Sequence, residues 1–107
     1  MPKILVMYPM PKDMDAFERA YAKEHIPMAA PIFKAAGATK VVLTKMSGSP
    51  EGKPAFHRIA EIHFPSAEKL QACAASQPGR DAIAHAHEIS NGGAPTVLIG
   101  DEEVVTF

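Results

Sequence analysis

The stretch KILVMYPMPKDMDAFERAYAKEHIPM, Lys3–Met28, decides the fold. Its first part, Lys3–Tyr8, is a short apolar run closed by prolines, which is typical of a buried strand. Asp13 can then cap a helix, because its side chain can accept a hydrogen bond from a backbone N–H of the first turn. Apolar residues recur at helical spacing from Met14 onward. The stretch therefore predicts a strand, a turn and an amphipathic helix.

The apolar stripe of this helix carries one titratable side chain. Phe17, Tyr21 and His25 share one helical face. Pro27 disfavours helical geometry at Ile26 and removes a backbone donor, so we expect the helix to end or kink beside His25. A second helical piece is expected over residues 31–36. A histidine placed in this way can face a pocket.

The remaining elements follow as two strands, a helix pair and a strand. We expect strands over Thr39–Met46, Phe56–Phe64 and Thr96–Ile99, helices from Ser66 to about Ala75 and from Pro78 to about Ile89, and a terminal extended segment over Val104–Phe107. This order is the β-α-β-β-α-β order of the ferredoxin-like fold, in the α+β class, with helices on one face of an antiparallel sheet. The first and fourth strands are apolar on both faces, so we expect a second copy to cover the open face and form a homodimer.

Composition limits the classes of partner. The length of 107 residues predicts a single domain over 1–107. The net charge of −1 and the absence of a basic cluster argue against nucleic acid and anionic membranes as partners. No apolar run is long enough for a membrane helix, and the single cysteine, Cys73, is expected to be a buried, inert thiol. These features favour a cytoplasmic protein.

Three segments together resemble the EthD family, named for a protein of ethyl tert-butyl ether degradation. They are Tyr21–Pro27 (YAKEHIP), Arg58–Phe64 (RIAEIHF) and Gly92–Ile99 (GGAPTVLI), and the resemblance spans nearly the whole chain. It implies a dimeric α+β barrel, related to methylmuconolactone isomerases, polyketide cyclases and cofactor-free oxygenases. It also implies that His25 matches the family's helix histidine and Glu61 its acidic third-strand residue.

His25 is the strongest candidate for a catalytic residue. Near a helix C-terminus the macrodipole favours the imidazolium, whereas burial favours neutral imidazole. A neutral imidazole in an apolar pocket is a suitable general base for a carbon acid or a phenol. The alternative is that His25 is structural and donates to a carbonyl left unpaired by Pro27.

The third strand provides a row of further candidates. Alternation places His57, Glu61 and His63 on one face, where they could line a cavity, orient a substrate or satisfy one another at a dimer interface. The family resemblance also matches His57 to a second histidine of the isomerase relatives. Tyr8, at the end of the first strand, could supply a hydroxyl to the same pocket, with Val6 lining the wall beside it.

His85 and His87 form a histidine pair that does not predict a metal site. They fall in a helical pattern, where residues two apart point in different directions, so we expect no metal there. A solvated helix end explains both.

The function that these features favour is a cofactor-independent isomerase, cyclase or decarboxylase of catabolism. Its pocket would lie between the sheet and the helix carrying Phe17, Tyr21 and His25. His25 would move a proton while Tyr8 or His63 polarises an oxygen of a small oxygenated substrate. The alternatives are a non-catalytic carrier for a partner oxygenase in ether or aromatic degradation, and a haem- or oxygen-using relative.

Overall fold

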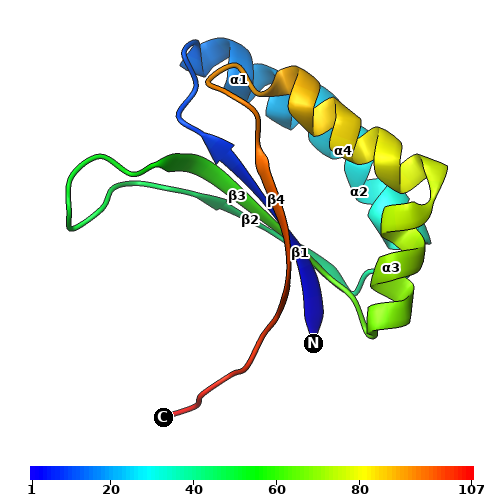
Figure 1. Cartoon of the computed structure of the whole chain (residues 1–107). Helices are drawn as coiled ribbons and strands as arrows, with labels where there is room; N and C mark the ends of the chain where they lie inside the picture. Colours follow the sequence, from blue (N-terminus) through cyan, green and yellow to red (C-terminus); the bar gives the residue numbers. More distant parts are fainter.

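An antiparallel sheet carries all the helices on one face, as Figure 1 shows for the computed structural model of residues 1–107. The elements are β1 (Pro2–Pro9), α1 (Met14–Ala20), a π-helical turn η1 (Tyr21–His25), α2 (Ile26–Ala35), β2 (Lys40–Lys45), β3 (Phe56–His63), α3 (Ala67–Ala75), α4 (Gln77–Ile89) and β4 (Thr96–Asp101). The strand order is β2-β3-β1-β4, with every neighbouring pair antiparallel. The ferredoxin-like α+β prediction is confirmed, including the central places of the first and third strands.

The start of α1 is fixed by its cap and by a distant loop. The Asp13 carboxylate accepts the Ala16 N–H at 3.0 Å, as predicted for an N-cap. The Asn91 side chain accepts the Asp13 N–H at 3.1 Å and donates to the Asp13 carbonyl at 2.9 Å. Gly92 follows where a Cβ would lie 1.8 Å from the Met10 carbonyl oxygen, so no larger residue fits there. The loops at this end of the sheet are thereby held together.

The helix continues through Pro27, so of the predicted end or kink beside His25 the structure shows an irregular turn and no end. Ile26 is helical, with φ −62° and ψ −45°, and its N–H bonds to the Tyr21 carbonyl five residues earlier. The ring of Pro27 would clash with the carbonyl four residues before it in a regular α-helix. The wide turn η1 replaces the expected end, and α2 continues through the piece expected over residues 31–36. The irregularity falls beside His25, as predicted.

A register shift at the end of β1 overturns the predicted alternation of β3. His57 has no pairing partner on β1, which marks a bulge. Its ring packs edge-on against Phe17 of α1, with 5.7 Å between ring centroids. His57 therefore faces the helices, and the expectation that it shares a face with Glu61 and His63 is wrong.

The two faces of the sheet differ in cover. On the helical face the side chains of Ile4, Val6 and Tyr8 alternate along β1 and are buried. The open face has apolar side chains on its central and edge strands, and Leu98 of β4 is 50% exposed there. The terminal residues 104–107, expected to be extended, form no strand and leave the body of the protein (Figure 1).

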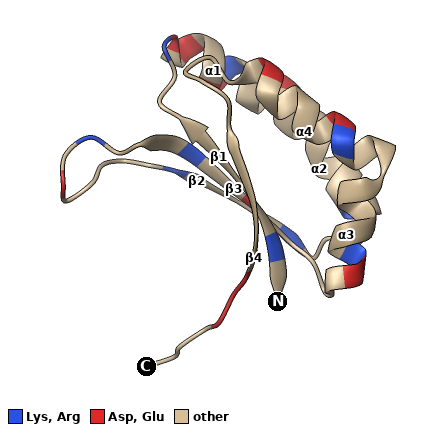
Figure 2. Ribbon diagram, in the orientation of Figure 1, with Lys and Arg blue, Asp and Glu red and all other residues tan.

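Acidic and basic residues do not form separate clusters. Figure 2 shows acidic and basic positions scattered over the helices, the strand ends and the β2–β3 loop. None of the helices combines the length and the apolar character needed to cross a bilayer.

Candidate functional site

A cavity of about 240 Å³ lies between the sheet and helices α2 and α4. The sequence predicted a pocket under the helix carrying Phe17, Tyr21 and His25, and of these three residues only His25 lines the cavity. Val6 and Tyr8 of β1 line it from the sheet, and Ala29 and Phe33 of α2 line it from the helices. His25 is the only lining residue that is not hydrophobic, and no lysine, arginine, aspartate or glutamate is among them. The site is therefore an apolar chamber with one imidazole in its wall.

The ring of His25 pairs with a second histidine. His25 Nδ1 lies 2.9 Å from Nδ1 of His85 on α4, and the rings stack with centroids 5.1 Å apart. His25 is 6% exposed, whereas His85 is half-buried. Burial first, and the neighbouring His85 second, lower the pKa of His25 to about 4. His25 is consequently neutral at pH 7.

The hydrogen bond between the two rings joins their Nδ1 atoms. One Nδ1 must donate and the other accept, so a neutral pair has one Nε2 that accepts and one that carries a proton. When His25 donates, its own Nε2 is a free acceptor, and no protein group hydrogen-bonds to it. A proton shift across the pair exchanges these roles. The arrangement can therefore carry a proton between the cavity and the half-buried side of α4.

The rings of Tyr8 and Tyr21 pack beside His25, and their hydroxyls have no protein partners. Tyr8 is fully buried and lines the cavity, and its hydroxyl and that of Tyr21 have no hydrogen-bond partner. Burial, followed by the neighbouring Tyr21, raises the pKa of Tyr8, and burial raises that of Tyr21 to about 12. Both hydroxyls remain donors at neutral pH. An unmade buried hydrogen bond costs about 1–3 kcal/mol, so Tyr8 is a strong candidate to bind a ligand oxygen.

A stack of planar groups supports His25 from the other side. The Tyr21 ring lies 6.1 Å from the His25 ring at 27°, and the Arg58 guanidinium lies 5.0 Å above Tyr21. Glu18 of α1 holds Arg58 through two hydrogen bonds of 3.2 and 3.0 Å. Burial would raise the pKa of Glu18, but the hydrogen bonds and charge of Arg58 lower it overall. The ion pair therefore clamps α1 to β3 and orients the stack.

Known proteins place the chain in a family. A sequence profile described as a domain of unknown function, DUF1330, matches residues 6–100. The chain belongs to the DUF1330 family. An uncharacterised 11.0 kDa protein from the thcB–thcC intergenic region of Rhodococcus erythropolis is 28% identical over 103 residues, covering 96% of each chain.

Solved structures of other proteins have the same fold as this DUF1330 chain. An ethyl tert-butyl ether degradation (EthD) family protein from Bacillus halodurans C-125 has a TM-score of 0.86 and 28% identity, covering 96% of this chain and 99% of its own. The resemblance to EthD proteins is confirmed. A dimeric ferredoxin-like protein of unknown function from Jannaschia sp. CCS1, with TM-score 0.73 and 15% identity, covers 94% of this chain and 98% of its own and shares the fold.

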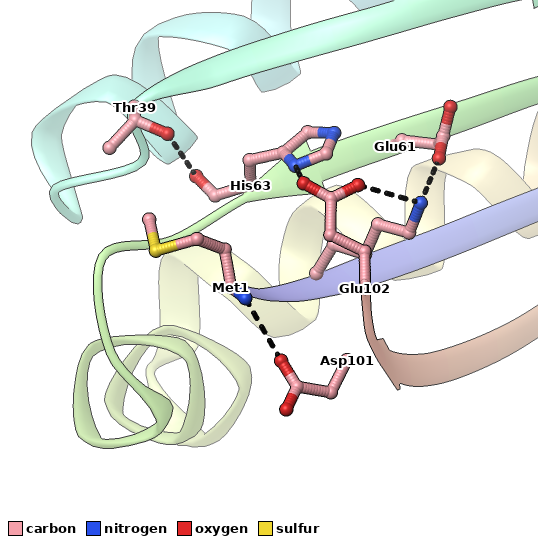
Figure 3. A network of polar contacts seen from close by, with 7 residues as sticks. Met1, Thr39, Glu61, His63, Asp101 and Glu102 are labelled. Carbon is pink, nitrogen blue, oxygen red and sulfur yellow. Dashed lines mark hydrogen bonds and ion pairs between the residues drawn. The ribbon is translucent and has the colours of Figure 1, made fainter. Parts of the chain in front are cut away.

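Two predicted site residues of the DUF1330 chain lie on the opposite side of the sheet. Figure 3 shows His63, Glu61 and Glu102 in one polar network, in which Lys3 contacts both Glu61 and Glu102. His63 Nδ1 lies 3.5 Å from a Glu102 oxygen, and Glu61 pairs with Lys3, whose pKa is raised chiefly by that hydrogen bond. Neither residue lines the cavity. The expectation that His63 polarises a ligand beside His25 is wrong, because strand alternation places His63 on the open face of the sheet whereas η1 carries His25 on the helical side.

The other predicted residues fall in and around the site. Val6 and Tyr8 line the cavity, while Phe17 and Tyr21 pack beside it. His57 does not line the cavity; its Nε2 lies 3.5 Å from a Glu18 oxygen without a hydrogen bond.

The main site residue that the sequence analysis missed is His85. It had been paired with His87, which is exposed. His85 lies three positions after the buried Ala82 and four positions before Ile89. This helical spacing already indicated that His85 lies near the apolar face of α4. The structure contains no group of three or more potential metal ligands.

Proposed function

We propose that this DUF1330 protein binds a small oxygenated molecule in the cavity and transforms it by acid–base chemistry at His25. The observation that carries the proposal is a buried, neutral imidazole that faces an apolar cavity while a second histidine backs it. Isomerisation and cyclisation both fit, and neither of them requires a cofactor. Decarboxylation fits less well, because no cation lines the cavity to hold a carboxylate. Such reactions occur in the breakdown of small organic molecules, and the cavity in which this one would take place has no charged lining residue.

The proposed step moves one proton from the ligand to solvent through two neutral rings and leaves the negative charge on the ligand, and the reverse relay then returns a proton to another atom of the ligand. Nε2 of His25 accepts a proton from an acidic C–H or O–H of the ligand, and Nδ1 of His25 passes its proton to Nδ1 of His85. His85 then loses its Nε2 proton to solvent. The Tyr8 hydroxyl donates to the ligand oxygen that gains electron density. Because the pKa of His25 is low, the ring suits a relayed transfer better than holding a charge.

Replacement of His25 tests this assignment. His25→Gln should reduce turnover of a substrate by about 10²-fold or more, which is the usual contribution of a positioned acid–base group. His85→Gln should reduce turnover and change its pH profile, because the relay is then interrupted. His87→Gln, on the exposed side of α4, is the matched control and should leave turnover unchanged. Unchanged turnover in His25→Gln would remove the enzymatic assignment.

A carrier function is the second candidate. The weak basicity of His25 and the uncharged cavity walls also suit a site that holds an apolar intermediate for a partner oxygenase. Calorimetry with candidate ligands, run beside product analysis by mass spectrometry, separates the two. Binding without product, with product formed only when an oxygenase is added, supports the carrier.

We also propose that the open sheet face packs against a second copy. Its centre is apolar, with Leu5 and Met7 of β1 beside Leu98 of β4. Glu61 lies on the same face beside Leu5, where its charge is paired with that of Lys3. The protein from Jannaschia with the same fold is described as dimeric.

A further inference from the structure

We infer that the cavity selects a neutral, single-ring molecule carrying a hydroxyl group, such as a phenol or a cyclic enol, and rejects carboxylates. This inference rests on the proposed function and names the ligand class of the same site. Three observations carry it: the size of the cavity, the absence of charge in its walls, and the presence of both Tyr8 and His25 among the lining residues.

The volume restricts the ligand to one ring. The cavity of about 240 Å³ is below the ~300–1,000 Å³ of pockets that hold drug-sized molecules. That volume suits a six-membered ring with one or two small substituents. A fused two-ring compound would require the helices to move.

The charges around the cavity argue against an anionic ligand. None of its lining residues is cationic at pH 7. The basic groups on the helical face are already engaged, since Arg58 and Lys45 both contact the Glu18 carboxylate. A carboxylate in the cavity would be buried without a counter-charge, and a buried acid in that position takes up a proton instead. An acid would therefore bind only in its protonated form.

The polar groups of the cavity match a hydroxyl. The Tyr8 hydroxyl has no protein partner, and it can donate because burial keeps it protonated. Nε2 of His25 accepts when Nδ1 donates to His85. A ligand hydroxyl can accept from Tyr8 and donate to His25 through one oxygen atom. A carbonyl alone would satisfy only Tyr8, and a hydrocarbon would satisfy neither.

Three ligands of the same shape test the inference in the full-length protein. We would titrate p-cresol, p-toluate and p-xylene and follow the amide resonances of Ala29, Ala82 and Ala86 by NMR. At pH 7 p-cresol should bind at least about 30-fold more tightly than p-toluate and several-fold more tightly than p-xylene. The affinity for p-toluate should rise about tenfold for each pH unit from 7 to 5, as its neutral form becomes populated, whereas that for p-cresol should stay constant.

A single variant locates the hydroxyl contact. Tyr8→Phe should lower the affinity for p-cresol about fivefold and leave p-xylene unchanged, because it removes one hydrogen bond and keeps the ring. The variant should fold normally, since the lost hydroxyl has no protein partner. Equal effects on both ligands would overturn the assignment of the contact.

The possible failures are distinguishable. If p-toluate binds as tightly as p-cresol and shows no dependence on pH, the ligand class is wrong while the cavity remains a binding site. If none of the three ligands shifts the cavity resonances, the proposed function itself fails.

Discussion

The two faces of the sheet each bury a histidine, but in opposite electrostatic surroundings. His25, on the helical face, meets only another histidine and apolar walls, and its pKa falls to about 4. His63, on the open face, lies beside Glu102 within a network of charges (Figure 3). An imidazole among carboxylates already has partners, whereas one in an apolar cavity is available to a ligand. The surroundings of a buried histidine, more than its burial, mark the candidate site.

The largest contrast between the faces should be in stability, and β3 offers a matched pair. Ile62 faces the helices and is 1% exposed, whereas Ile59 is half-buried on the open face. Ile62→Ala should lower the free energy of unfolding by about 2–5 kcal/mol because it leaves a cavity in the core. Ile59→Ala should cost less and act mainly on dimerisation. Urea denaturation at two protein concentrations measures both effects, and equal losses would show that the faces are equally packed.

The second contrast is in pH dependence. The pKa of His25 is lowered from 6.5 to about 4, so the unfolded chain binds a proton that the folded chain refuses in this window. The free energy of unfolding should therefore fall as pH falls from 6.5 to 4, by up to about 3 kcal/mol. His25→Gln should flatten this slope and His87→Gln should not. NMR titration of the His25 ring gives a direct check, and a midpoint above 6 would contradict the neutral imidazole.

The third contrast is in dimerisation, which should depend on the open face of the sheet. Leu98→Lys places a charge in the apolar centre of the proposed interface and should weaken dimerisation at least about tenfold. Ala84→Lys, on the exposed side of α4, is the control with the same added charge. Light scattering coupled to size-exclusion chromatography measures the mass. A wild-type monomer at micromolar concentration would refute the proposed interface.

The smallest effect is expected from the polar network. Lys3 and Glu61 keep about a fifth of their side-chain surface exposed, so water screens their attraction. Glu61→Gln should change the free energy of unfolding by about 1 kcal/mol or less, and the change should shrink in high salt. A loss as large as that from Ile62→Ala would mean that the network is buried in the assembled protein.

The fold was predictable from local rules, and the site was predictable in part. Asp13 and Ser66 predicted the two helix starts, because a cap depends only on neighbours in sequence. The order of elements along the chain predicted the ferredoxin-like sheet, and apolar residues on both sides of the first and fourth strands predicted the exposed second face. His25 and Tyr8 followed from the apolar stripe and the end of β1. The contact of His25 with His85 joins residues far apart in the chain, and spacing within one helix could not supply it.

Two errors have a common physical origin. Regular periodicity assigned His57 to the face of Glu61, but the bulge inserts an unpaired residue and turns His57 toward α1. The backbone restrictions of Pro27 predicted an end or a kink beside His25, but the wide turn η1 carries the helix past the proline. In both places the chain departs from a regular period, and both places adjoin the candidate site.

The wide turn η1 makes the site depend on chain length as well as on side-chain identity. Its five-residue hydrogen bond, from the Ile26 N–H to the Tyr21 carbonyl, accommodates one residue more than an ordinary helical turn. Shortening the chain by one exposed residue there, such as Ala22, would swing His25 about a quarter of a turn around the helix axis and away from His85. A single-codon deletion that alters no buried side chain would thereby uncouple the imidazole pair.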